Sequence, residues 1–454
     1  MLGLISAVAA LTASASPFVR KPCADLQVAA RAQCGTVSVA EDRSFPTGRQ
    51  IALNVIIIPA AKPAKDRQAL FDLDGGPGLA DTKNASFYTT AGATYAASRD
   101  VVLIDQRGTG GSNPLDCPEF EKADRGLEPM FPAAAVRSCR VRMGRSADLT
   151  RYTSEDAVED LEAVRRSLGY TKIDLFALSY GTTLALRYIA DHGANVRSAV
   201  LLSAVPPSAM PPRYHAIAAQ QALDQLMADC RADAKCRATY PRLRIDLANA
   251  LRRIGSGRQI GGQVVMERLR TKLYSPNEAR TVPWVIRRLS TGDTSILVSR
   301  DEGAGLKFYD GVYLTITCSE SLPWFSQERA AAEARRTLFG DYRLARQREA
   351  CARWPRAQVK PGFFAPVRSS VPTLFLSGGR DPVTPASWAK QASRYFPNSR
   401  QIVIPWAGHI VDGLTGLDTC FDPQILHFYA TADPGAVDAS CFKKMTPPPF
   451  KDAP

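Results

Sequence analysis

The chain has 454 residues, of which 45% are hydrophobic and 22% are charged, a composition typical of a large globular protein. Its formal net charge of +13 comes from arginines spread along the chain, without the basic and aromatic motifs of a nucleic-acid binder. Beyond the N-terminus, no apolar run is long enough to span a membrane. The composition therefore excludes a disordered chain, and it predicts neither a membrane span nor a nucleic-acid partner.

The first fifteen residues differ from the rest because they are apolar and small. They end in Ala13-Ser14-Ala15, which resembles the A-x-A site at which a secretory signal peptide is cleaved. We therefore expect residues 1–15 to be a signal peptide and the protein to be exported, periplasmic or secreted. The alternative interpretation is a buried first helix or strand.

Ten cysteines support the expectation of export, because disulfides form and persist in oxidising compartments. They are Cys23, Cys34, Cys117, Cys139, Cys230, Cys236, Cys318, Cys351, Cys420 and Cys441. None forms a C-x-x-C pair and no histidine lies at zinc-finger spacing, so we expect no metal site. The cysteines fall in sequence into five neighbouring pairs, and we predict disulfides within these pairs, although sequence alone does not fix connectivity.

Short apolar runs alternate with helical patterns from about residue 69 onward. Strands are predicted at 50–59, 69–73, 100–104, 173–178, 196–203, 371–377 and 401–405. Helices are predicted at 154–168, after the strand at 173–178, at 388–395 and at 423–429. Thr153 and Asp156 resemble a capping box, and Gly169 ends the first of these helices. The alternation predicts a mostly parallel, doubly wound α/β sheet.

Strand patterns stop after Pro206-Pro207 and return only near residue 370. The intervening residues are rich in alanine, arginine and glutamine at helical spacing. We predict a helical cap or lid over 206–368, inserted into a core formed by 16–205 and 369–454. The proline-rich tail from Thr446 is expected to be loose.

The segment Ala177-Leu178-Ser179-Tyr180-Gly181 joins the strand at 173–178 to the next helix. A serine flanked by small residues at a sharp strand-to-helix turn is the pattern of a nucleophile elbow, usually written G-x-S-x-G. Ala177 stands where that pattern has its first glycine. Ser179 is thus the candidate nucleophile, and the alternative is a serine that merely lies between small residues.

A serine nucleophile needs a base and a group that orients the base. Among four histidines, His192 ends a helix, His215 lies in the insertion and His427 lies inside a helical pattern. His409 follows the strand at 401–405 in a glycine-containing loop, so we predict that it is the base. Asp381 follows the preceding strand and fits the chain order serine, acid, histidine; the alternative is an aspartate of a plain Gly/Pro turn.

The negatively charged oxygen of the tetrahedral intermediate requires backbone N–H donors. The N–H of Tyr180, directly after the serine, is one candidate. The glycine-rich loop Gly75-Gly76-Pro77-Gly78 follows the strand at 69–73, and we choose Gly76 as the second donor. The alternative is an ordinary tight turn.

Taken together, these motifs resemble the α/β-hydrolase serine exopeptidases of the proline iminopeptidase and secreted tripeptidyl aminopeptidase group. The matching segments are 74–78 (DGGPG), 105–112 (DQRGTGGS), 179–182 (SYGT), 381–385 (DPVTP) and 408–409 (GH). The resemblance covers about 50–205 and 370–445. Asp74 stands where iminopeptidases often have histidine, and Ala177 replaces a glycine, but neither change removes a reacting group. Within DQRGTG, we expect Asp105 and Arg107 to brace the loops around the site.

The resemblance implies an α/β-hydrolase fold with a helical cap and a peptide substrate with a free N-terminus, and no cofactor is expected. It also implies acidic residues that hold the substrate's α-amine. Glu320, beside Cys318, is the candidate anchor; the alternative is a solvated surface glutamate.

We therefore predict an exported serine aminopeptidase with the triad Ser179, Asp381 and His409. An esterase or other small-acyl hydrolase would use the same triad, so it stays open as an alternative. A binding protein on a hydrolase scaffold is a third hypothesis, because fold alone does not decide function.

Overall fold

The structure is a computed structural model, and it describes residues 16–24, 28, 30–64, 67–121, 128–255, 261–297 and 307–452. The predicted signal peptide, residues 1–15, lies outside the described residues. In the described part of the chain, no helix is both long enough and apolar enough to cross a membrane.

A nine-stranded sheet forms the centre of the molecule, in the order β1-β2-β3-β5-β4-β6-β7-β8-β9. The strands are β1 (Val19–Lys21), β2 (Gln33–Ala40), β3 (Gln50–Ile58), β4 (Ala69–Leu73), β5 (Asp100–Ile104), β6 (Ile173–Leu178), β7 (Val196–Leu202), β8 (Thr373–Gly378) and β9 (Ser399–Ile404). β1, β2, β3 and β5 pair antiparallel in turn, whereas β5, β4, β6, β7, β8 and β9 run parallel. The predicted mostly parallel α/β sheet is thereby confirmed.

The burial of each strand follows from its place in the sheet. The central strands β4 and β5 are buried at every position, as expected for parallel strands that are covered on both faces. Antiparallel β3 alternates between buried and more exposed residues instead, because one of its faces meets solvent. β2 has a similar alternation, although no strand was predicted from the sequence before residue 50.

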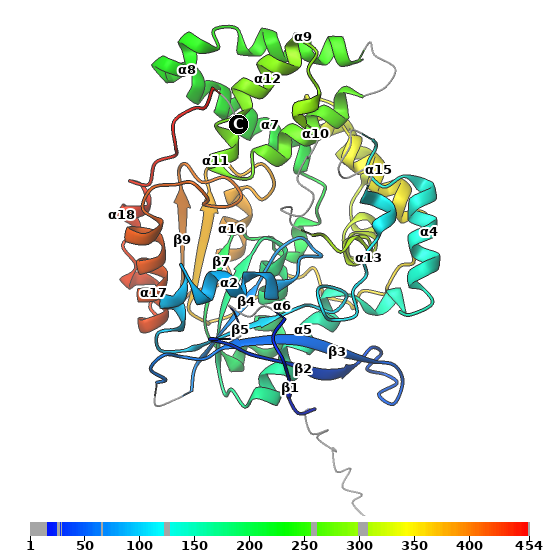
Figure 1. The fold of residues 1–454 in the computed structure, drawn as a ribbon, viewed down its shortest axis with the longest axis vertical. Coiled ribbons are helices and arrows are strands. Elements are labelled where there is room, and N and C mark those ends of the chain that lie inside the picture. The colour runs from blue at the N-terminus through cyan, green and yellow to red at the C-terminus, as the bar shows by residue number, and fades with distance from the viewer. Residues whose placement is uncertain are drawn as a thin grey trace, which may run out of the picture.

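Helices cover both faces of the sheet (Figure 1). The helices of the core are α2 (Ala85–Thr89), α4 (Ala133–Met143), α5 (Ser154–Leu168), α6 (Tyr180–His192), α16 (Ala386–Ser393), α17 (Asp422–Thr431) and α18 (Ala439–Phe442). Helices α4, α5 and α6 share a hydrophobic cluster with one face of the sheet, and α2, α17 and α18 share one with the other. The predicted start of α5 is confirmed, because the Thr153 hydroxyl accepts from the Asp156 amide and Gly169 is left-handed, with φ of 76°.

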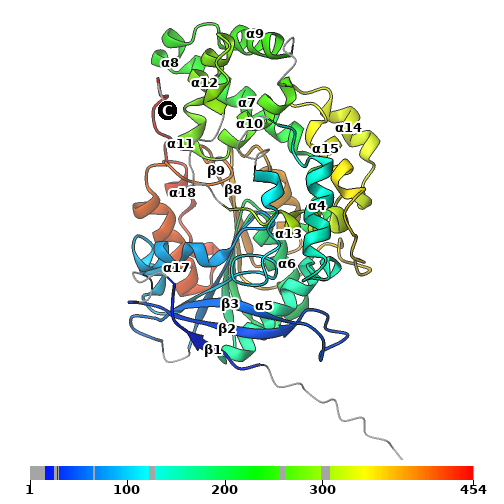
Figure 2. The same cartoon turned by 45° about the vertical axis from the view of Figure 1, so that its right-hand side comes forward.

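The described residues between β7 and β8 form helices and no strand. The helices are α7 (His215–Ala232), α8 (Ala234–Thr239), α9 (Leu243–Gly255), α10 (Gly262–Lys272), α11 (Pro276–Ala279), α12 (Val282–Ser290), α13 (Asp310–Glu320), α14 (Gln327–Ala334) and α15 (Tyr342–Cys351). Helices α7–α10 and α12 pack around a hydrophobic cluster of their own. Helices α13–α15 contribute instead to the cluster on one face of the sheet. Figures 1 and 2 show α7–α12 at the end of the molecule toward which the parallel strands point.

All ten cysteines are paired, and the pairs are the five sequence neighbours: Cys23–Cys34, Cys117–Cys139, Cys230–Cys236, Cys318–Cys351 and Cys420–Cys441. The predicted pairing is confirmed by the Sγ–Sγ contacts. Cys318–Cys351 joins α13 to α15 within the insertion.

The C-terminal tail is packed against the insertion, and the expectation that it is loose was wrong. Phe450 is buried in the hydrophobic cluster of α7–α12, and the Arg280 guanidinium lies 4.1 Å from the centre of its ring. The Lys451 amide donates to the Arg280 carbonyl at 3.0 Å. The tail therefore links the end of the core to the insertion, an arrangement that a proline-rich composition does not reveal.

Candidate active site

Ser179 lies at the turn between β6 and α6 and has the strained backbone of a nucleophile elbow. Its φ and ψ are 56° and −125°, a conformation that side-chain-bearing residues rarely adopt. The glycine two residues later is required by packing, since a Cβ atom on Gly181 would lie 2.0 Å from the Leu73 carbonyl oxygen. Ala177 is fully buried, and Ser179 itself is partly exposed. The turn thus presents a serine hydroxyl at the carboxyl edge of the sheet.

Asp381 and His409 meet at the same edge, after β8 and β9. His409 Nδ1 lies 3.0 Å from Asp381 Oδ2, and both side chains are buried. The other carboxylate oxygen accepts from the amides of Val383 and Thr384, each at 2.8 Å. Thr384 also donates its hydroxyl to Asp381 Oδ2 at 2.5 Å. These contacts fix the carboxylate so that the opposite ring nitrogen, Nε2, points away from Asp381.

The electrostatics of this pair favour an ionised aspartate. Burial by itself would raise the pKa of Asp381. The adjacent His409, together with hydrogen bonds from His409 and Thr384, outweighs burial and holds the pKa of Asp381 below its ordinary value. An ionised carboxylate is what stabilises a positively charged imidazole during proton transfer.

The backbone of His409 is held by both the core and the insertion. Its carbonyl accepts from the Ser203 hydroxyl at 2.8 Å. Its amide donates to the Tyr274 carbonyl at 2.7 Å, and the Tyr274 ring packs edge-on against the imidazole with centroids 4.9 Å apart. A Cβ atom on Gly408 would lie 2.3 Å from the Tyr274 carbonyl oxygen, which explains the glycine before the histidine.

The structure therefore brings Ser179, Asp381 and His409 to one edge of the sheet, with only the Asp381–His409 bond formed. Among the described residues, no hydrogen bond joins the Ser179 hydroxyl to His409. Catalytic hydrogen bonds are often long in free enzymes and shorten when substrate binds. Tyr274 was not identified from the sequence, because nothing local to α10 or α11 marks it as a neighbour of a loop 135 residues later in the chain.

The other three histidines lie where the sequence predicted them, at the end of a helix, in the insertion and within a helix. His192 Nε2 lies 2.9 Å from Glu159 at the end of α6, and His427 is exposed on α17. His215 is buried at the start of α7.

The glycine-rich loop after β4 faces the elbow. A Cβ atom on Gly75 would lie 2.8 Å from Ser179 Cβ, so only glycine allows this approach. The Gly75 amide donates to Asp74 Oδ1 at 2.6 Å, which leaves the next amide, that of Gly76, as the predicted donor of this loop. The Tyr180 amide is at the first position of α6, where helical N–H groups have no partner within the helix.

Three carboxyl groups lie behind the glycine-rich loop. Asp81 Oδ1 accepts from the Asp74 amide at 3.0 Å, and Asn84 donates to both Asp72 and Asp74. Burial, followed by repulsion from Asp74, raises the pKa of Asp72 to about 7 and that of Asp81 well above its ordinary value. Hydrogen bonds through Asp81 and Asn84 therefore fix the start of the glycine-rich loop relative to β4.

Glu320 lies at the end of α13 rather than in a loop, and it is buried. Its two oxygens accept from the Ser154 amide at 2.7 Å and from the Ser154 hydroxyl at 2.5 Å. Burial raises the pKa of Glu320 to about 7. The Ser154 hydroxyl also lies 2.8 Å from the Tyr180 hydroxyl. Glu320 is therefore connected to the residue after Ser179, and an ammonium group would have to displace Ser154 to reach it.

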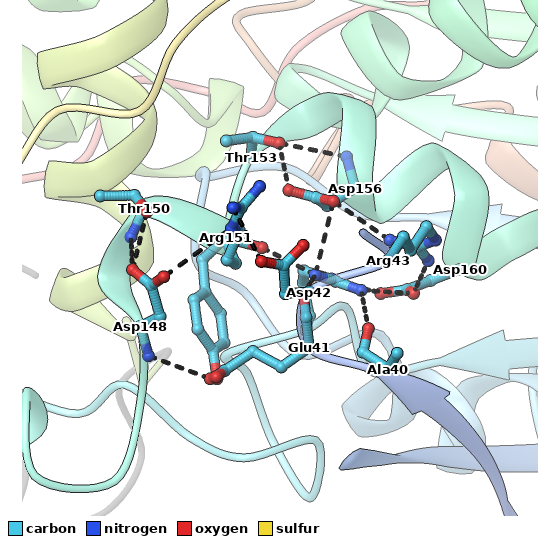
Figure 3. Close-up of polar contacts among 12 residues, drawn as sticks. Ala40, Glu41, Asp42, Arg43, Asp148, Thr150, Arg151, Thr153, Asp156 and Asp160 are labelled. Atoms are coloured by element: carbon cyan, nitrogen blue, oxygen red, sulfur yellow. Dashed lines mark hydrogen bonds and ion pairs between the residues drawn. The ribbon is translucent and has the colours of Figure 1, made fainter. Parts of the chain in front are cut away.

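The DQRGTG segment braces the site, as expected. Arg107 is 1% exposed and donates to both carboxylate oxygens of Asp160 and to the carbonyls of Ala40, Glu41 and Arg151. Figure 3 shows the surrounding network, in which Asp160 also contacts Arg43, and Glu41 accepts from the Asp148 amide.

Asp105 has a similar bracing role on the other side of the same turn. It accepts from the amides of Thr82 and Gly111 and from the side chains of Thr82 and Asn54. Neither Asp105 nor Arg107 contacts the triad directly; both hold the loops that position it.

Two families match the chain over most of the sheet domain. The α/β-hydrolase fold family matches residues 74–234, and the TAP-like protein family matches residues 336–441. The first range includes the elbow, and the second includes Asp381 and His409.

Individual relatives extend the likeness along the chain. A tripeptidyl aminopeptidase of Streptomyces coelicolor is 26% identical over 98% of this chain and 89% of its own length. The serine protease Hip1 of Mycobacterium tuberculosis is 24% identical over 78% of this chain and 77% of its own length. Among solved structures, the proline iminopeptidase of Mycobacterium smegmatis is 17% identical, with a TM-score of 0.44 over 88% of this chain and 99% of its own. The chain therefore has the α/β-hydrolase fold, is similar to tripeptidyl aminopeptidases, and is a serine peptidase or hydrolase.

Proposed function

We propose that this protein is an exported serine aminopeptidase that removes N-terminal residues from peptides through an acyl-enzyme. The observation that carries the proposal is the buried Asp381–His409 pair at 3.0 Å, at the same sheet edge as the strained Ser179 turn. The relatives named tripeptidyl aminopeptidase support peptides as the substrates.

In this mechanism, Ser179 Oγ attacks the scissile carbonyl while His409 Nε2 takes the hydroxyl proton. Asp381 holds the imidazole in the required tautomer and stabilises its charged form. The amides of Tyr180 and Gly76 donate to the oxyanion. His409 then protonates the departing amine, which leaves the N-terminal part of the peptide esterified to Ser179. Water, deprotonated by His409, hydrolyses this ester and restores the free enzyme.

The exopeptidase character rests on the helical insertion, which we propose acts as a cap over 206–368 on a core of 16–205 and 369–454. The insertion holds His409 through Tyr274 and packs on the glycine-rich loop, where the Tyr309 amide donates to the Gly78 carbonyl at 2.8 Å. A cap held this close to both sides of the serine would admit a chain end more easily than the middle of a folded polypeptide. We therefore propose a substrate with a free N-terminus.

Export to the periplasm or the medium is supported by the five disulfides, which suit an oxidising compartment. It is also supported by the A-x-A pattern that ends at Ala15. Mass spectrometry of the N-terminal peptide of the protein recovered from a producing cell tests this proposal. A chain that begins at Ser16 is expected, and an intact chain found with the cytoplasmic fraction would contradict it.

A substrate panel tests the activity. Tripeptidyl and aminoacyl arylamides are compared with p-nitrophenyl esters, and each peptide is offered with a free or an acetylated N-terminus. Rapid hydrolysis of free-amine peptides, together with a phosphonate label on the Ser179 peptide, is expected. Esters cleaved with far higher kcat/KM than any peptide would favour an esterase, an alternative suggested by the relative named carboxylesterase B, 25% identical over 90% of this chain.

A further inference from the structure

A group of polar side chains in the insertion lies beside His409 and has no part in the proposed triad. We call it the insertion cluster, and it consists of His215 on α7, Glu267 and Arg270 on α10, Tyr313 on α13, and Arg343 and Gln347 on α15. Figure 1 shows α7, α10 and α15 near one another, above the ends of the parallel strands.

One carboxylate in this cluster serves two guanidinium groups. Glu267 Oε1 accepts from Arg270 Nε at 3.0 Å and Nη2 at 2.5 Å, and it accepts from Arg343 Nε at 2.9 Å and from Arg343 Nη2. Arg270 is 2% exposed, and the side chains of Glu267 and Arg343 are also largely covered. The group therefore has a net charge of +1 in surroundings where charge is weakly screened.

The cluster is connected to His409 through Tyr274. Arg270 Nη1 donates to the Tyr274 hydroxyl at 2.7 Å, and the Arg270 guanidinium lies 5.2 Å from the centre of that ring. The same ring packs on the imidazole of His409. Because His409 protonates the departing amine, groups around its imidazole are near the part of the substrate that leaves.

The hydrogen bonding of the cluster is incomplete. Among the described residues, neither ring nitrogen of His215 has a partner, although this side chain is only 8% exposed. Burial lowers the pKa of His215, and the charges of Arg270, Arg343 and His409 lower it further, so the ring is neutral and keeps one N–H to donate. Buried polar groups without partners are rare, because each costs stability unless a bound group completes it.

We propose that the insertion cluster binds a carboxylate of the peptide substrate, on the side of the leaving group. This inference rests on the proposed function. Arg343 and Arg270 supply the charge, and His215 supplies a further donor. The carboxylate is either the C-terminal one of a short peptide or an acidic side chain close to the scissile bond. A substrate ammonium group would meet two guanidinium groups for one carboxylate, so the charge balance disfavours it.

Matched peptides test the proposal on the full-length enzyme. A tetrapeptide with a free C-terminal acid is compared with its amide, and an amidated peptide whose leaving residue is Glu is compared with its Gln counterpart. We expect kcat/KM to be about 10- to 100-fold higher for one acid of these pairs, as charge-assisted hydrogen bonds to an anion imply. The pair that shows the difference identifies which carboxylate is bound.

Substitutions assign the effect to the cluster. Arg343→Gln is expected to bring the acid-to-amide ratio of kcat/KM toward one, mainly through KM for the acid, and Arg343→Lys to restore part of the ratio. Glu267→Gln removes the opposing charge and is expected to maintain or increase the ratio. Arg288→Gln is the matched control, because it removes one positive charge from the surface of α12, where Arg288 pairs with Asp293; it should leave the ratio unchanged.

Two results would overturn the inference. One is equal kcat/KM for acid and amide in both wild-type pairs, a comparison that does not depend on the folding of any variant. The other is a Glu267→Gln enzyme that loses activity only on peptides with a free N-terminus, which would make Glu267 an ammonium anchor. A tripeptidyl arylamide, which has no carboxylate, separates the two proposals: its hydrolysis supports the aminopeptidase even where the acid preference is absent.

Discussion

The sheet edge and the insertion above it differ in how the charges of their buried groups are balanced. At the sheet edge, Arg107 has every side-chain nitrogen bonded, to Asp160 and to three carbonyls, and the Asp105 carboxylate receives four hydrogen bonds. In the insertion, Arg270 and Arg343 also have every side-chain nitrogen bonded, but four of these bonds share one oxygen of Glu267, and His215 has no partner among the described residues.

From this difference we infer that the sheet edge positions the site residues and that the insertion cluster recognises the substrate. A fully bonded buried network has one favourable arrangement, so it can hold Ser179, Asp381 and His409 in place without any ligand. A cluster with a net charge and an imidazole without partners has its best arrangement only when another group is present. We therefore expect substitutions at the sheet edge to remove catalysis or stability, and those in the insertion to change selectivity.

The largest effect is expected for the nucleophile. Ser179→Ala removes the only atom that forms the acyl-enzyme, so kcat should fall about 10⁴-fold or more while the melting temperature stays unchanged. Steady-state kinetics and circular dichroism measure the two quantities. Retention of most of the turnover would disprove the triad, and a lowered melting temperature would show that the serine has a structural role.

The buried Arg107–Asp160 pair should contribute more to the free energy of unfolding than an exposed ion pair does. Arg107→Met leaves the buried Asp160 with an incomplete set of partners and is expected to lower the free energy of unfolding by about 3–5 kcal/mol. Arg43→Met is the matched control, because Arg43 binds the same carboxylate but its side chain is 32% exposed, and it should cost about 1 kcal/mol or less. Equal losses in urea titrations of the two variants would contradict the difference in burial as the cause.

Glu320 predicts a pH dependence of stability. Burial raises its pKa from 4.5 in the unfolded chain to about 7 in the folded one, so the folded protein binds more protons between these values. Stability therefore falls as pH rises from about 4 to 7, and Glu320 accounts for roughly 3 kcal/mol of the fall.

Glu320→Gln should flatten this dependence, because the amide does not titrate. Unfolding free energies measured at pH 4.5 and at pH 7.5 give the comparison for both proteins. Asp72, whose pKa burial also raises to about 7, will leave part of the slope in the variant. If stability falls equally with pH in both proteins, a group other than Glu320 is responsible for the fall.

Most of the sheet, and the place of the three predicted site residues at one of its edges, could be predicted from the sequence because the signals are local. Ser179 directly follows β6, Asp381 and His409 lie in the loops after β8 and β9, and the carboxyl ends of parallel strands lie at one edge. Gly181 and Gly408 are required by close backbone approaches, so the pattern of small residues was informative as well. The capping residue Thr153 and the five cysteine pairs could also be predicted, because each involves residues that are neighbours in the sequence.

The insertion could not be predicted in the same way, because its important contacts join helices far apart in the chain. Arg343 reaches Glu267 across 76 residues, and no motif marks either one. Glu320 was chosen for its place beside Cys318, and no sequence pattern indicates that Ser154 would occupy both of its oxygens. Which arginines share a carboxylate depends on how the helices pack, and the hydrophobic periodicity of the sequence does not show this packing.

Tyr274 joins the two regions, and its substitution should have the smallest effect of those considered. Tyr274→Phe keeps the ring on His409 but loses the hydroxyl that accepts from Arg270. We expect kcat/KM for a tripeptidyl arylamide to fall about threefold to tenfold, because one hydrogen bond to a charged group is lost while the backbone contacts to His409 remain. Tyr240→Phe is the control, since the Tyr240 hydroxyl donates to the Lys451 carbonyl at 3.2 Å and not to a member of the insertion cluster. If both variants lose activity equally, the hydroxyl of Tyr274 acts only through the stability of the insertion, and the sheet edge and the insertion cluster are not coupled through this ring.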